Sequence, residues 1–394
     1  MKLYQFMKQS IFVMAVLTLT TSCTKPQDNK PGSDPGDPTG TGSSGGYKVT
    51  VTTIAGKLQD QGSAEDGNGS HARFWNPTKM VYDNRNHLLY VADGTVVRSI
   101  DEQNNVATYM PLGVISRWSE ILDMDLAPGA GGSLYLVTAE NDLIKIEPGG
   151  NGVKKTVLAE RTYGGNATGS LNSSDHFDGA NGIATGKSGE IYFFNTFWAT
   201  MHQIVLNPAS STTGTVKQFV GKALASRSGE SWPFADGQGE TATFGSGVYD
   251  IASDAQGTIY VADAKNYELR MVTPAGMVSS LMLRKVPNYG EEVDGPVSTK
   301  ARANGVLQVS CSQDGSLIFF NTYGKGGWQN SPALRVVKDK KEVFTLVGTS
   351  NAYGDGTEKT AAFGTIGGLA STPDGKTVYV SEPAMKVIRK VVLQ

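Results

Sequence analysis

The stretch VYDIASDAQGTIYVADAKNYELRMVTPAGMVSSLML, from Val248 to Leu283, contains four apolar segments separated by polar turns. VYDIASD, TIYVAD, YELRMVT and MVSSLML have the length and the Val, Ile and Tyr content of β-strands, and the turns AQG and PAG contain glycine. The nearly continuous apolar content of the first two segments favours burial on both faces. In the third segment Glu268 and Arg270 alternate with apolar residues, which is typical of a half-exposed strand. The stretch therefore predicts one four-stranded antiparallel unit.

The second of these segments recurs six times along the chain, and a shorter basic-apolar segment follows each copy. Neighbouring copies lie between 47 and 68 residues apart, and each ends in an acid or an amide. The terminal residues are Asp93, Glu140, Asn195, Asp263, Asn321 and Glu382. Repeats of this length that consist of β-strands are typical of propellers. We predict an all-β fold, a six-bladed β-propeller of four-stranded blades, over residues 48–394.

The sixth repeat contains only three strands before the chain ends at Gln394. The segment KVTVTTIAG, which starts at Lys48, precedes the first blade and has no partner there. Its pairing with the terminal segment KVIRKVVLQ supplies the missing outer strand and protects the sheet edge. We therefore expect the N-terminal strand to close the ring by pairing into the last blade.

A short element precedes several of the innermost strands and carries a family resemblance. DGNGSHARF, DGQGETATF and DGTEKTAAF start at Asp66, Asp236 and Asp355, and a degenerate copy, DGPVSTKARA, starts at Asp294. Together with the upstream TIAG and TLVG and the downstream YVAD, these elements resemble the NHL-repeat propeller family. The resemblance covers roughly residues 48–394 and implies a six-bladed propeller. Blades two and three lack the full element.

The N-terminal region predicts export and a lipid anchor. Residues 1–22 have a basic start, a short apolar core and small residues before Cys23, which is typical of a signal peptide. The ending LTTSC resembles a lipobox, so we expect acylation of Cys23. Residues 23–47 are rich in Pro, Gly, Ser and Asp and predict a flexible tether. This tether resembles those of outer-membrane lipoproteins of the Bacteroidota type. We expect a cell-envelope protein, an outer-membrane lipoprotein exposed at the surface, that contacts the membrane through its lipid alone.

Composition limits the classes of partner. The net charge is −2, so the chain lacks the basic surplus of nucleic-acid-binding proteins, and we expect no nucleic-acid partner. Cys311 is the only cysteine besides Cys23, so we expect no intrachain disulfide and predict a small buried apolar side chain at Cys311.

The candidate binding surface is the propeller face that carries the loops between second and third strands and between successive blades. All five tryptophans fall in these loops, whereas the short turns of the opposite face lack large aromatic residues. Aromatic rings among polar groups suit a glycan, and they equally suit an envelope protein, because Trp, Tyr and Arg dominate interface hot spots. Wedging between blades is the structural alternative, above all for Trp75 and for Phe244 and Phe363 of the repeated element. The candidate ligand-binding residues are Trp75, Trp198, Trp232, Trp328, Tyr267, Tyr289, Tyr323, Arg73 and His71.

Catalytic and metal-binding patterns are weak in this sequence. The four histidines are scattered and no cysteine is free to join them, so we expect neither a metal site nor a cofactor. The acids that end the second strands could form a glycosidase pair. Their regular repetition favours a structural role as acceptors for N–H groups of the turns to the third strands.

We therefore favour binding over catalysis. The predicted function is binding of a glycan or a partner protein through the aromatic-rich face, as an accessory to a glycan-import system. A polysaccharide hydrolase or lyase acting on the same face is the first alternative. A scaffold subunit of an outer-membrane complex is the second.

Overall fold

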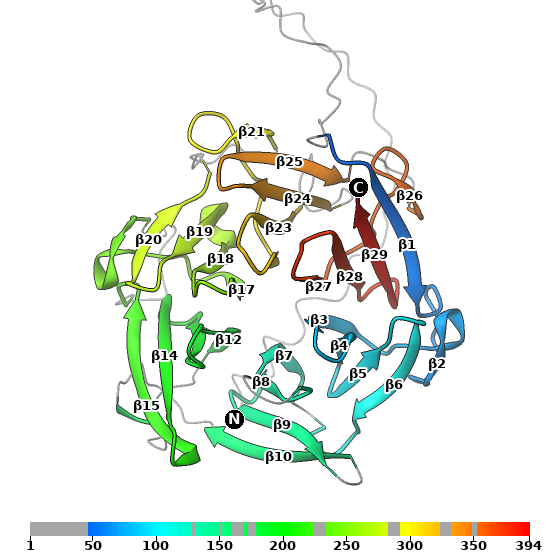
Figure 1. Cartoon of the computed structure of the whole chain (residues 1–394), viewed down its shortest axis with the longest axis horizontal. Coiled ribbons are helices and arrows are strands. Elements are labelled where there is room, and N and C mark those ends of the chain that lie inside the picture. Colours follow the sequence, from blue (N-terminus) through cyan, green and yellow to red (C-terminus); the bar gives the residue numbers. More distant parts are fainter. Residues whose placement is uncertain are drawn as a thin grey trace, which may run out of the picture. The chain divides into compact units, whose positions relative to one another are not determined.

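The computed structural model describes residues 46–117, 119–127, 131–149, 152–159, 169–171, 179–223, 234–282, 292–323, 332–348 and 353–394. The described residues form six antiparallel sheets arranged around an axis (Figure 1), which confirms the predicted all-β, six-bladed propeller. The predicted signal peptide, Cys23, and the tether up to residue 45 lie outside the described residues. Within the described part of the chain, no helix has the length and apolar character needed to cross a membrane.

Each blade contains four main strands, ordered from the axis outward. Blade one consists of β3 (Pro77–Asp83), β4 (Leu88–Asp93), β5 (Val96–Ile100) and β6 (Asn105–Met110). Blade two consists of β7 (Ile121–Leu126), β8 (Leu134–Thr138), β9 (Leu143–Gly149) and β10 (Gly152–Ala159). Blade three consists of β12 (Ala180–Thr185), β13 (Ile191–Asn195), β14 (Thr200–Asn207) and β15 (Ser210–Val220).

The remaining blades repeat this order. Blade four consists of β17 (Val248–Ser253), β18 (Ile259–Asp263), β19 (Glu268–Val272) and β20 (Met277–Ser280). Blade five consists of β22 (Val309–Cys311), β23 (Leu317–Thr322), β24 (Ala333–Lys338) and β25 (Glu342–Val347). Blade six consists of β27 (Gly368–Ser371), β28 (Thr377–Glu382), β29 (Val387–Leu393) and β1 (Val49–Ala55).

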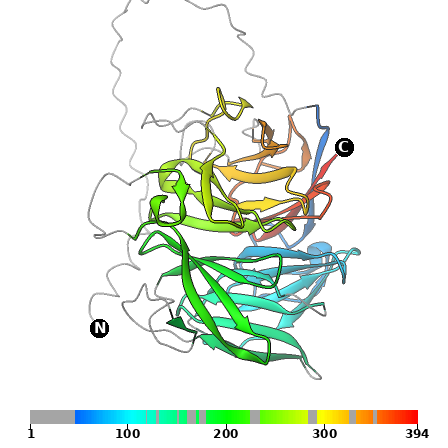
Figure 2. The same ribbon diagram turned by 60° about the vertical axis from the view of Figure 1, so that its left-hand side comes forward.

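The innermost strands form a closed ring, because β3, β7, β12, β17, β22 and β27 each contact the next and β27 contacts β3. Antiparallel sheets radiate from this ring (Figure 1), and the oblique view in Figure 2 shows their twist. Each of the six hydrophobic clusters combines apolar side chains of two adjacent blades, as Tyr90 of blade one packs with Leu134 of blade two. Burial of apolar surface between the blades is therefore what holds the ring together.

The first strand of the propeller lies in its last blade. β1 pairs antiparallel with β29 from Val49 opposite Leu393 to Ala55 opposite Ile388. Its other edge pairs with β26 (Gly356–Thr357). The sixth sheet thus combines the two ends of the propeller sequence.

Five of the six sheets carry a fifth strand that the sequence pattern did not predict. These strands have two residues each and pair with the outermost main strand of their own blade. They are β2 (Gly67–Asn68), β11 (Gly169–Ser170), β16 (Gly237–Gln238), β21 (Gly295–Pro296) and β26. Four of the five begin at the glycine of the repeated Asp-Gly element. The element therefore closes the outer edge of its blade before the chain turns inward.

The alternation of polar and apolar residues predicted a half-exposed third strand in blade four, and this prediction was wrong. The Asp-Gly element explains the difference. Glu268 and Arg270 are both 0% exposed. The Arg270 guanidinium donates hydrogen bonds to Asp236 of the element at 2.7 Å and to Asp263 at 3.3 Å, and it lies over the ring of Phe244. Asp236 in turn accepts a hydrogen bond from the Ser280 N–H of the outer strand. A loop from earlier in the chain thus covers the polar side of the third strand.

The same arrangement occurs in four blades. Each pairs a fully buried third-strand arginine with the aspartate of the Asp-Gly element, which also accepts N–H and O–H bonds from a Thr or Ser of the outer strand. The pairs are Arg98–Asp66, Arg270–Asp236, Arg335–Asp294 and Arg389–Asp355. The recurring element is therefore a structural unit of the blade.

Candidate functional site

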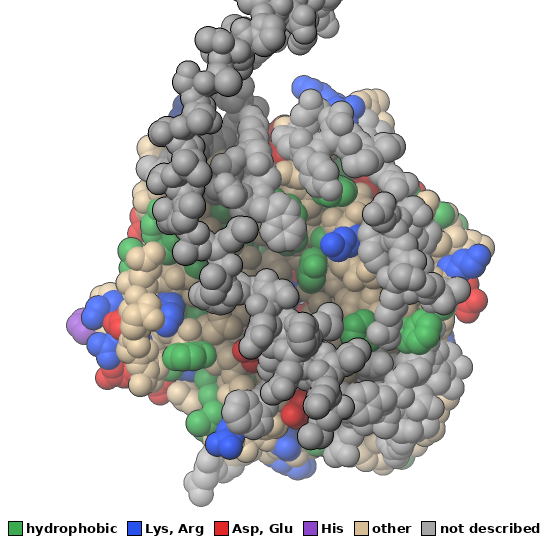
Figure 3. All heavy atoms as spheres, turned by 180° about the vertical axis from the view of Figure 1, so that it is seen from behind, with side chains coloured by type: hydrophobic (Ala, Val, Ile, Leu, Met, Phe, Trp, Pro, Cys, Tyr) green, Lys and Arg blue, Asp and Glu red, His purple; other side chains and the backbone are tan. Residues whose placement is uncertain are grey.

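Two faces of the propeller are candidates for function. We call the face where the innermost strands begin the loop face, and the face where they end, at the short turns to the second strands, the turn face. Figure 3 looks at the loop face, where apolar side chains and lysine or arginine residues are visible between atoms that are not described. Trp232, Tyr289 and Trp328 of the predicted binding residues lie outside the described residues.

Trp75 is 61% exposed, the largest exposed fraction among the described aromatic residues predicted to bind. Its backbone N–H donates to the Asp93 carboxylate at 2.8 Å, which fixes the start of the innermost strand of blade one. The Lys386 ammonium lies 5.3 Å from the centre of the indole ring, within the range of a cation–π contact. Trp75 is therefore an anchored but exposed aromatic surface and does not fill a space between blades.

Arg73 and His71 have polar contacts with residues that are near them in the sequence. The Arg73 guanidinium forms ion pairs with Asp60 and Glu65, both at 3.0 Å, and these hold the loop that precedes blade one. His71 is exposed at the end of the short 3-10 turn Gly69–His71, and its Nδ1 lies 3.3 Å from the Asn68 carbonyl oxygen. The structure gives Arg73 a structural contact and leaves His71 beside the outer edge of blade one.

Tyr267 and Tyr323 are brought together with a third tyrosine. Burial, and then the nearby phenols of Tyr249 and Tyr267, raise the pKa of Tyr323 to about 12. Tyr249 is 39% exposed and is the second residue of β17, the innermost strand of blade four. Tyr249 was not among the predicted binding residues because it belongs to a strand segment, although its place next to the loop face was a usable signal. These three residues form the tyrosine group of the loop face.

Trp198 lies between β13 and β14 of blade three. It is half-buried in blade three, its backbone N–H lies 3.2 Å from Asn195 Oδ1, and its indole N–H lacks a hydrogen-bond partner among the described residues. The structure therefore distributes the described aromatic candidates around the ring, and it joins only Tyr267 and Tyr323.

Three of the four acids that end the second strands have the structural role that their repetition predicted. Asp93, Asp263 and Glu382 are buried, and desolvation raises the pKa of each carboxyl. The main-chain donors come mostly from the loop before the innermost strand, as with the Gly245 N–H to Asp263 at 3.0 Å, and not from the predicted turn to the third strand. Arginines of the third strands bind the same carboxylates. These acids are committed to holding the blades.

A buried charge cluster crosses the axis of the propeller. Lys79 of β3 reaches β17, which belongs to the opposite blade of the ring, and its ammonium donates to Asp250 Oδ1 at 2.6 Å. It also donates to Gln308 Oε1 at 2.7 Å and to the Tyr249 carbonyl oxygen at 2.9 Å. Asp123 Oδ1 of blade two lies 3.9 Å from the same nitrogen. We call Lys79, Asp123, Asp250 and Gln308 the axial plug.

The axial plug also satisfies the free edges of the innermost strands. Asp123 accepts a hydrogen bond from the Ile183 N–H of the next blade, and Asp250 accepts one from the Val309 N–H, both at 2.8 Å. Unpaired edge N–H groups are costly when buried, so these bonds stabilise the centre of the ring. Burial raises the pKa of both carboxyls, and the charge of Lys79 opposes this shift.

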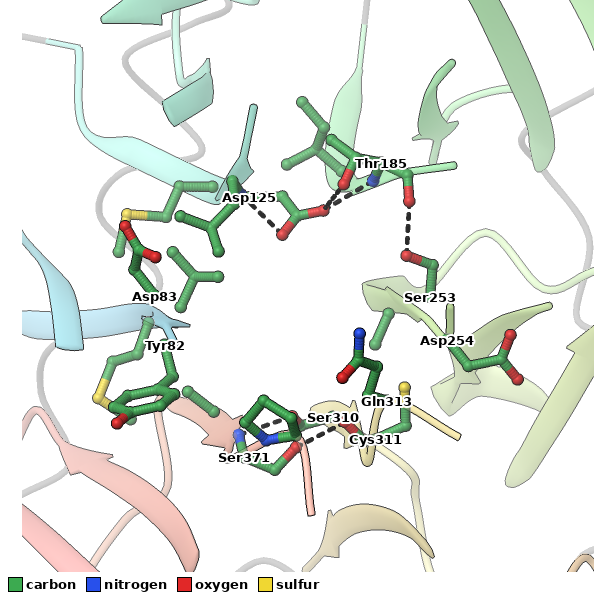
Figure 4. Close-up of a pocket in the computed structure, with 18 of the residues that line it drawn as sticks. Tyr82, Asp83, Asp125, Thr185, Ser253, Asp254, Ser310, Cys311, Gln313 and Ser371 are labelled. Atoms are coloured by element: carbon green, nitrogen blue, oxygen red, sulfur yellow. Dashed lines mark hydrogen bonds between the residues drawn. The ribbon is translucent and has the colours of Figure 1, made fainter. Parts of the chain in front are cut away.

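A cavity of about 510 Å³ lies between the axial plug and the turn face. Its walls come from the innermost strands of all six blades, and Figure 4 shows their side chains around an open centre. Lys79, Asp123 and Asp250 form its closed end, and the turns that follow the innermost strands form its mouth. Cys311 borders this cavity and is only partly buried, so the prediction of a buried apolar side chain was wrong. Burial still raises the pKa of its thiol. We call this cavity the axial cup.

Polar groups converge on the axial cup. Asp125 accepts hydrogen bonds from the Thr185 N–H at 2.7 Å, the Thr185 hydroxyl at 2.9 Å and the Leu126 N–H at 2.8 Å. The Ser253 hydroxyl donates to the Thr185 carbonyl oxygen at 2.6 Å. The side chain of Gln313 projects toward the centre (Figure 4). The sequence signal for this site was present as charged residues inside the otherwise apolar segments TKMVYD, ILDMDL and VYDIAS.

Asp125 gives the axial cup a predicted pH dependence. Burial raises the pKa of its carboxyl from 3.8 to about 6 in the folded protein. The folded state therefore binds the proton more tightly than the unfolded state, and the stability that this proton provides is lost as the pH rises through 6. Because the carboxyl borders a cavity open to solvent, about 3 kcal/mol is an upper bound for the loss.

We expect Asp125→Asn, which keeps an acceptor for Thr185 but cannot ionise, to lose less unfolding free energy than the wild type between pH 5 and pH 7.5. Urea unfolding at both pH values measures this difference. Equal losses in the two proteins would contradict the raised pKa of Asp125.

No group of three or more histidine, cysteine or carboxylate side chains in the described part of the chain is arranged to hold a metal ion. The axial cup instead offers hydroxyl, amide, carboxylate and main-chain groups. Such groups bind by hydrogen bonding.

Comparisons with known proteins support the fold. No protein-family model matches the chain, and no curated protein matches it. Among solved structures, an auxiliary nutrient binding protein from Bacteroides ovatus is similar over 88% of this chain and 77% of its own, with a TM-score of 0.61 and 17% identity. An auxiliary nutrient binding protein from Bacteroides thetaiotaomicron is similar over the same shares, with a TM-score of 0.60 and 16% identity. At these identities the likeness shows a shared propeller fold.

Proposed function

We propose that this protein is an accessory binding protein of the bacterial cell envelope whose loop face binds a glycan. The observation that carries the proposal is Trp75, a tryptophan that is 61% exposed while its backbone is bonded to Asp93 and its ring is contacted by Lys386. Tryptophan is among the residue types that dominate binding hot spots, and here its backbone is already fixed. The C–H face of a sugar that stacks on the indole ring of Trp75 would bury this exposed apolar surface.

The tyrosine group provides a second aromatic surface on the same face. Tyr249, Tyr267 and Tyr323 each combine an apolar ring with a hydroxyl that can bond to a sugar hydroxyl. A polymer that contacts both surfaces would span blades one, four and five. The similar structures of auxiliary nutrient binding proteins from Bacteroides support an accessory binding role of this kind.

The NHL-type repeat and the envelope location belong to the same proposal. In it, residues 1–22 direct export, Cys23 carries the lipid, and residues 23–47 hold the propeller clear of an outer membrane. A glycan-import system at that membrane is the partner that such an accessory protein would serve. The repeated Asp-Gly element and the lipobox-like LTTSC support these assignments.

The proposal predicts that Trp75→Ala weakens retention on a polysaccharide. Affinity electrophoresis through gels that contain a panel of soluble polysaccharides measures the dissociation constant. Loss of a hot-spot aromatic side chain costs about 2 kcal/mol or more, which corresponds to roughly 30-fold weaker binding. Tyr323→Ala tests the tyrosine group in the same way.

Val205→Ala is the matched control, because Val205 is an exposed apolar residue (45%) on the outer part of blade three. Its retention should equal that of the wild type. The proposal fails if no polysaccharide in the panel retards the wild type, or if Trp75→Ala and Tyr323→Ala are retarded as strongly as the wild type.

A further inference from the structure

The axial cup has the form of a small-molecule site and is separate from the loop face. Its volume of about 510 Å³ falls in the range of about 300–1,000 Å³ that ligand pockets occupy. The axial plug closes it toward the loop face, since the Lys79 ammonium and the Asp250 carboxylate meet at 2.6 Å across the axis. Among the described residues, the opening of the cup is at the turn face, so a ligand would enter from that side.

The hydrogen-bonding capacity of the wall indicates which chemistry fits. Asp125 Oδ1 accepts one described hydrogen bond, from Leu126, so it can accept another. The Ser253 hydroxyl uses its proton on Thr185 and keeps its lone pairs for a donor. The exposed Gln313 amide provides both a donor and an acceptor at the mouth. The cup thus offers free acceptor positions on Asp125 and Ser253 and a donor on the Gln313 amide.

We propose that the axial cup binds a small, neutral, polyhydroxylated molecule of monosaccharide or disaccharide size. Vicinal hydroxyls of such a molecule donate to Asp125 and Ser253 and exchange hydrogen bonds with the Gln313 amide. The apolar parts of the wall, which include Val81 and Ala252, face its C–H groups.

The charges around the cup favour a neutral ligand over an ion. Asp123 and Asp250 at the closed end are engaged by Lys79 and by strand-edge N–H groups, so they offer little to a cationic ligand. The other two acids of the wall, Asp83 and Asp254, accept hydrogen bonds from main-chain N–H groups, and Asp254 also accepts one from the Tyr260 hydroxyl. The side chains of Arg85 and Lys187 are exposed at the mouth and repel a cation that enters. The Asp125 carboxylate repels an anion.

Saturation-transfer NMR tests this proposal with the full-length protein and a defined set of probes. The probes are D-glucose, D-galactose, D-mannose, N-acetyl-D-glucosamine and, as the cationic competitor class, 1,4-diaminobutane. We expect at least one sugar to receive saturation and 1,4-diaminobutane to receive none. Saturation of none of the sugars, or of the diamine alone, would overturn the proposal.

Two substitutions at Gln313 locate the binding. Gln313 is exposed, and its main chain makes the hydrogen bonds to Ala255 and Pro373, so both variants keep the fold. Gln313→Ala removes the amide and should weaken binding three- to tenfold, the equivalent of one hydrogen bond. Gln313→Trp narrows the mouth and should abolish binding.

Gln256→Ala is the matched control, because Gln256 lies exposed in a turn of the same face but does not line the cup. Its affinity for the sugar should be that of the wild type. Sugar binding that survives in both Gln313 variants would place the ligand elsewhere and refute the proposal. Because Trp75→Ala acts only on the loop face, loss of polysaccharide retention and loss of cup binding are distinguishable.

Discussion

Replacement of Arg270 by methionine is expected to lower the free energy of unfolding by about 3 to 5 kcal/mol. The guanidinium is 0% exposed and donates to Asp236 and Asp263 at 2.7 and 3.3 Å. It also donates to the carbonyl oxygens of Ala235 and Thr243, which holds the preceding loop against the third strand. Methionine fills similar space but leaves the Asp263 carboxylate buried without its cation, and such a charge is strongly destabilising.

The pH dependence of this variant separates the charge effect from a packing effect. Desolvation already raises the pKa of Asp263, and loss of Arg270 raises it further. A raised pKa in the folded state stabilises at low pH and costs stability as the pH increases. Urea unfolding should therefore show a smaller loss for Arg270→Met at pH 5 than at pH 8.

Arg85→Met is the control for the loss of an arginine, because Arg85 is exposed in a turn. We expect a change within about 0.5 kcal/mol. If the free energy of unfolding of Arg270→Met lies within 1 kcal/mol of the wild-type value at pH 8, the buried arginine does not stabilise the blade.

Local sequence patterns were sufficient to predict the blades but not to predict that Arg270 is buried. Segments such as TIYVAD have strand periodicity, and their sixfold recurrence determines the number of blades. The exposure of Arg270 depends on Asp236, which lies 34 residues earlier in the chain. Periodicity within a strand contains no information about such a distant partner.

Comparison between the repeats held the missing information. The four blades that carry the full Asp-Gly element also carry the third-strand arginine, whereas the other two blades lack the full element and have no arginine in the third strand. In blade three the equivalent position is His202, which is opposite Phe193 as Arg270 is opposite Val261. Joint presence and absence across blades indicates that the two residues pair.

The two candidate sites also differ in how far the sequence alone could predict them. The loop-face aromatic residues were recognisable from composition, because tryptophan is rare in solvent-exposed loops without a role. The axial cup depends on which strand edges meet at the axis, and that follows only from closure of the ring. Lys79 and Asp250 are 171 residues apart in the chain and became neighbours only when blades one and four faced each other.

Lys79→Met is expected to destabilise the propeller by about 3 to 5 kcal/mol at pH 8, because it removes the cation of the axial plug. Lys79 is 7% exposed, and its ammonium bonds to Asp250 and approaches Asp123 to 3.9 Å. Without it, two buried carboxyls face each other, and their pKa values, already raised by burial, rise further. Protonation relieves the repulsion, so the loss should shrink at pH 5. Thermal and urea unfolding at both pH values measure this difference.

The double variant Lys79→Met/Asp250→Asn identifies the unpaired charge as the cause. Asparagine keeps an acceptor for the Val309 N–H, which Asp250 binds at 2.8 Å, but carries no charge. We expect the double variant to be more stable than Lys79→Met at pH 8 and to depend less on pH. Lys187→Met, at an exposed lysine of the turn face, should leave stability unchanged. If the double variant is no more stable than Lys79→Met, then the bonds of the ammonium to Gln308 and Tyr249 matter more than its charge. The axial plug would then act as a hydrogen-bonded strut between opposite blades.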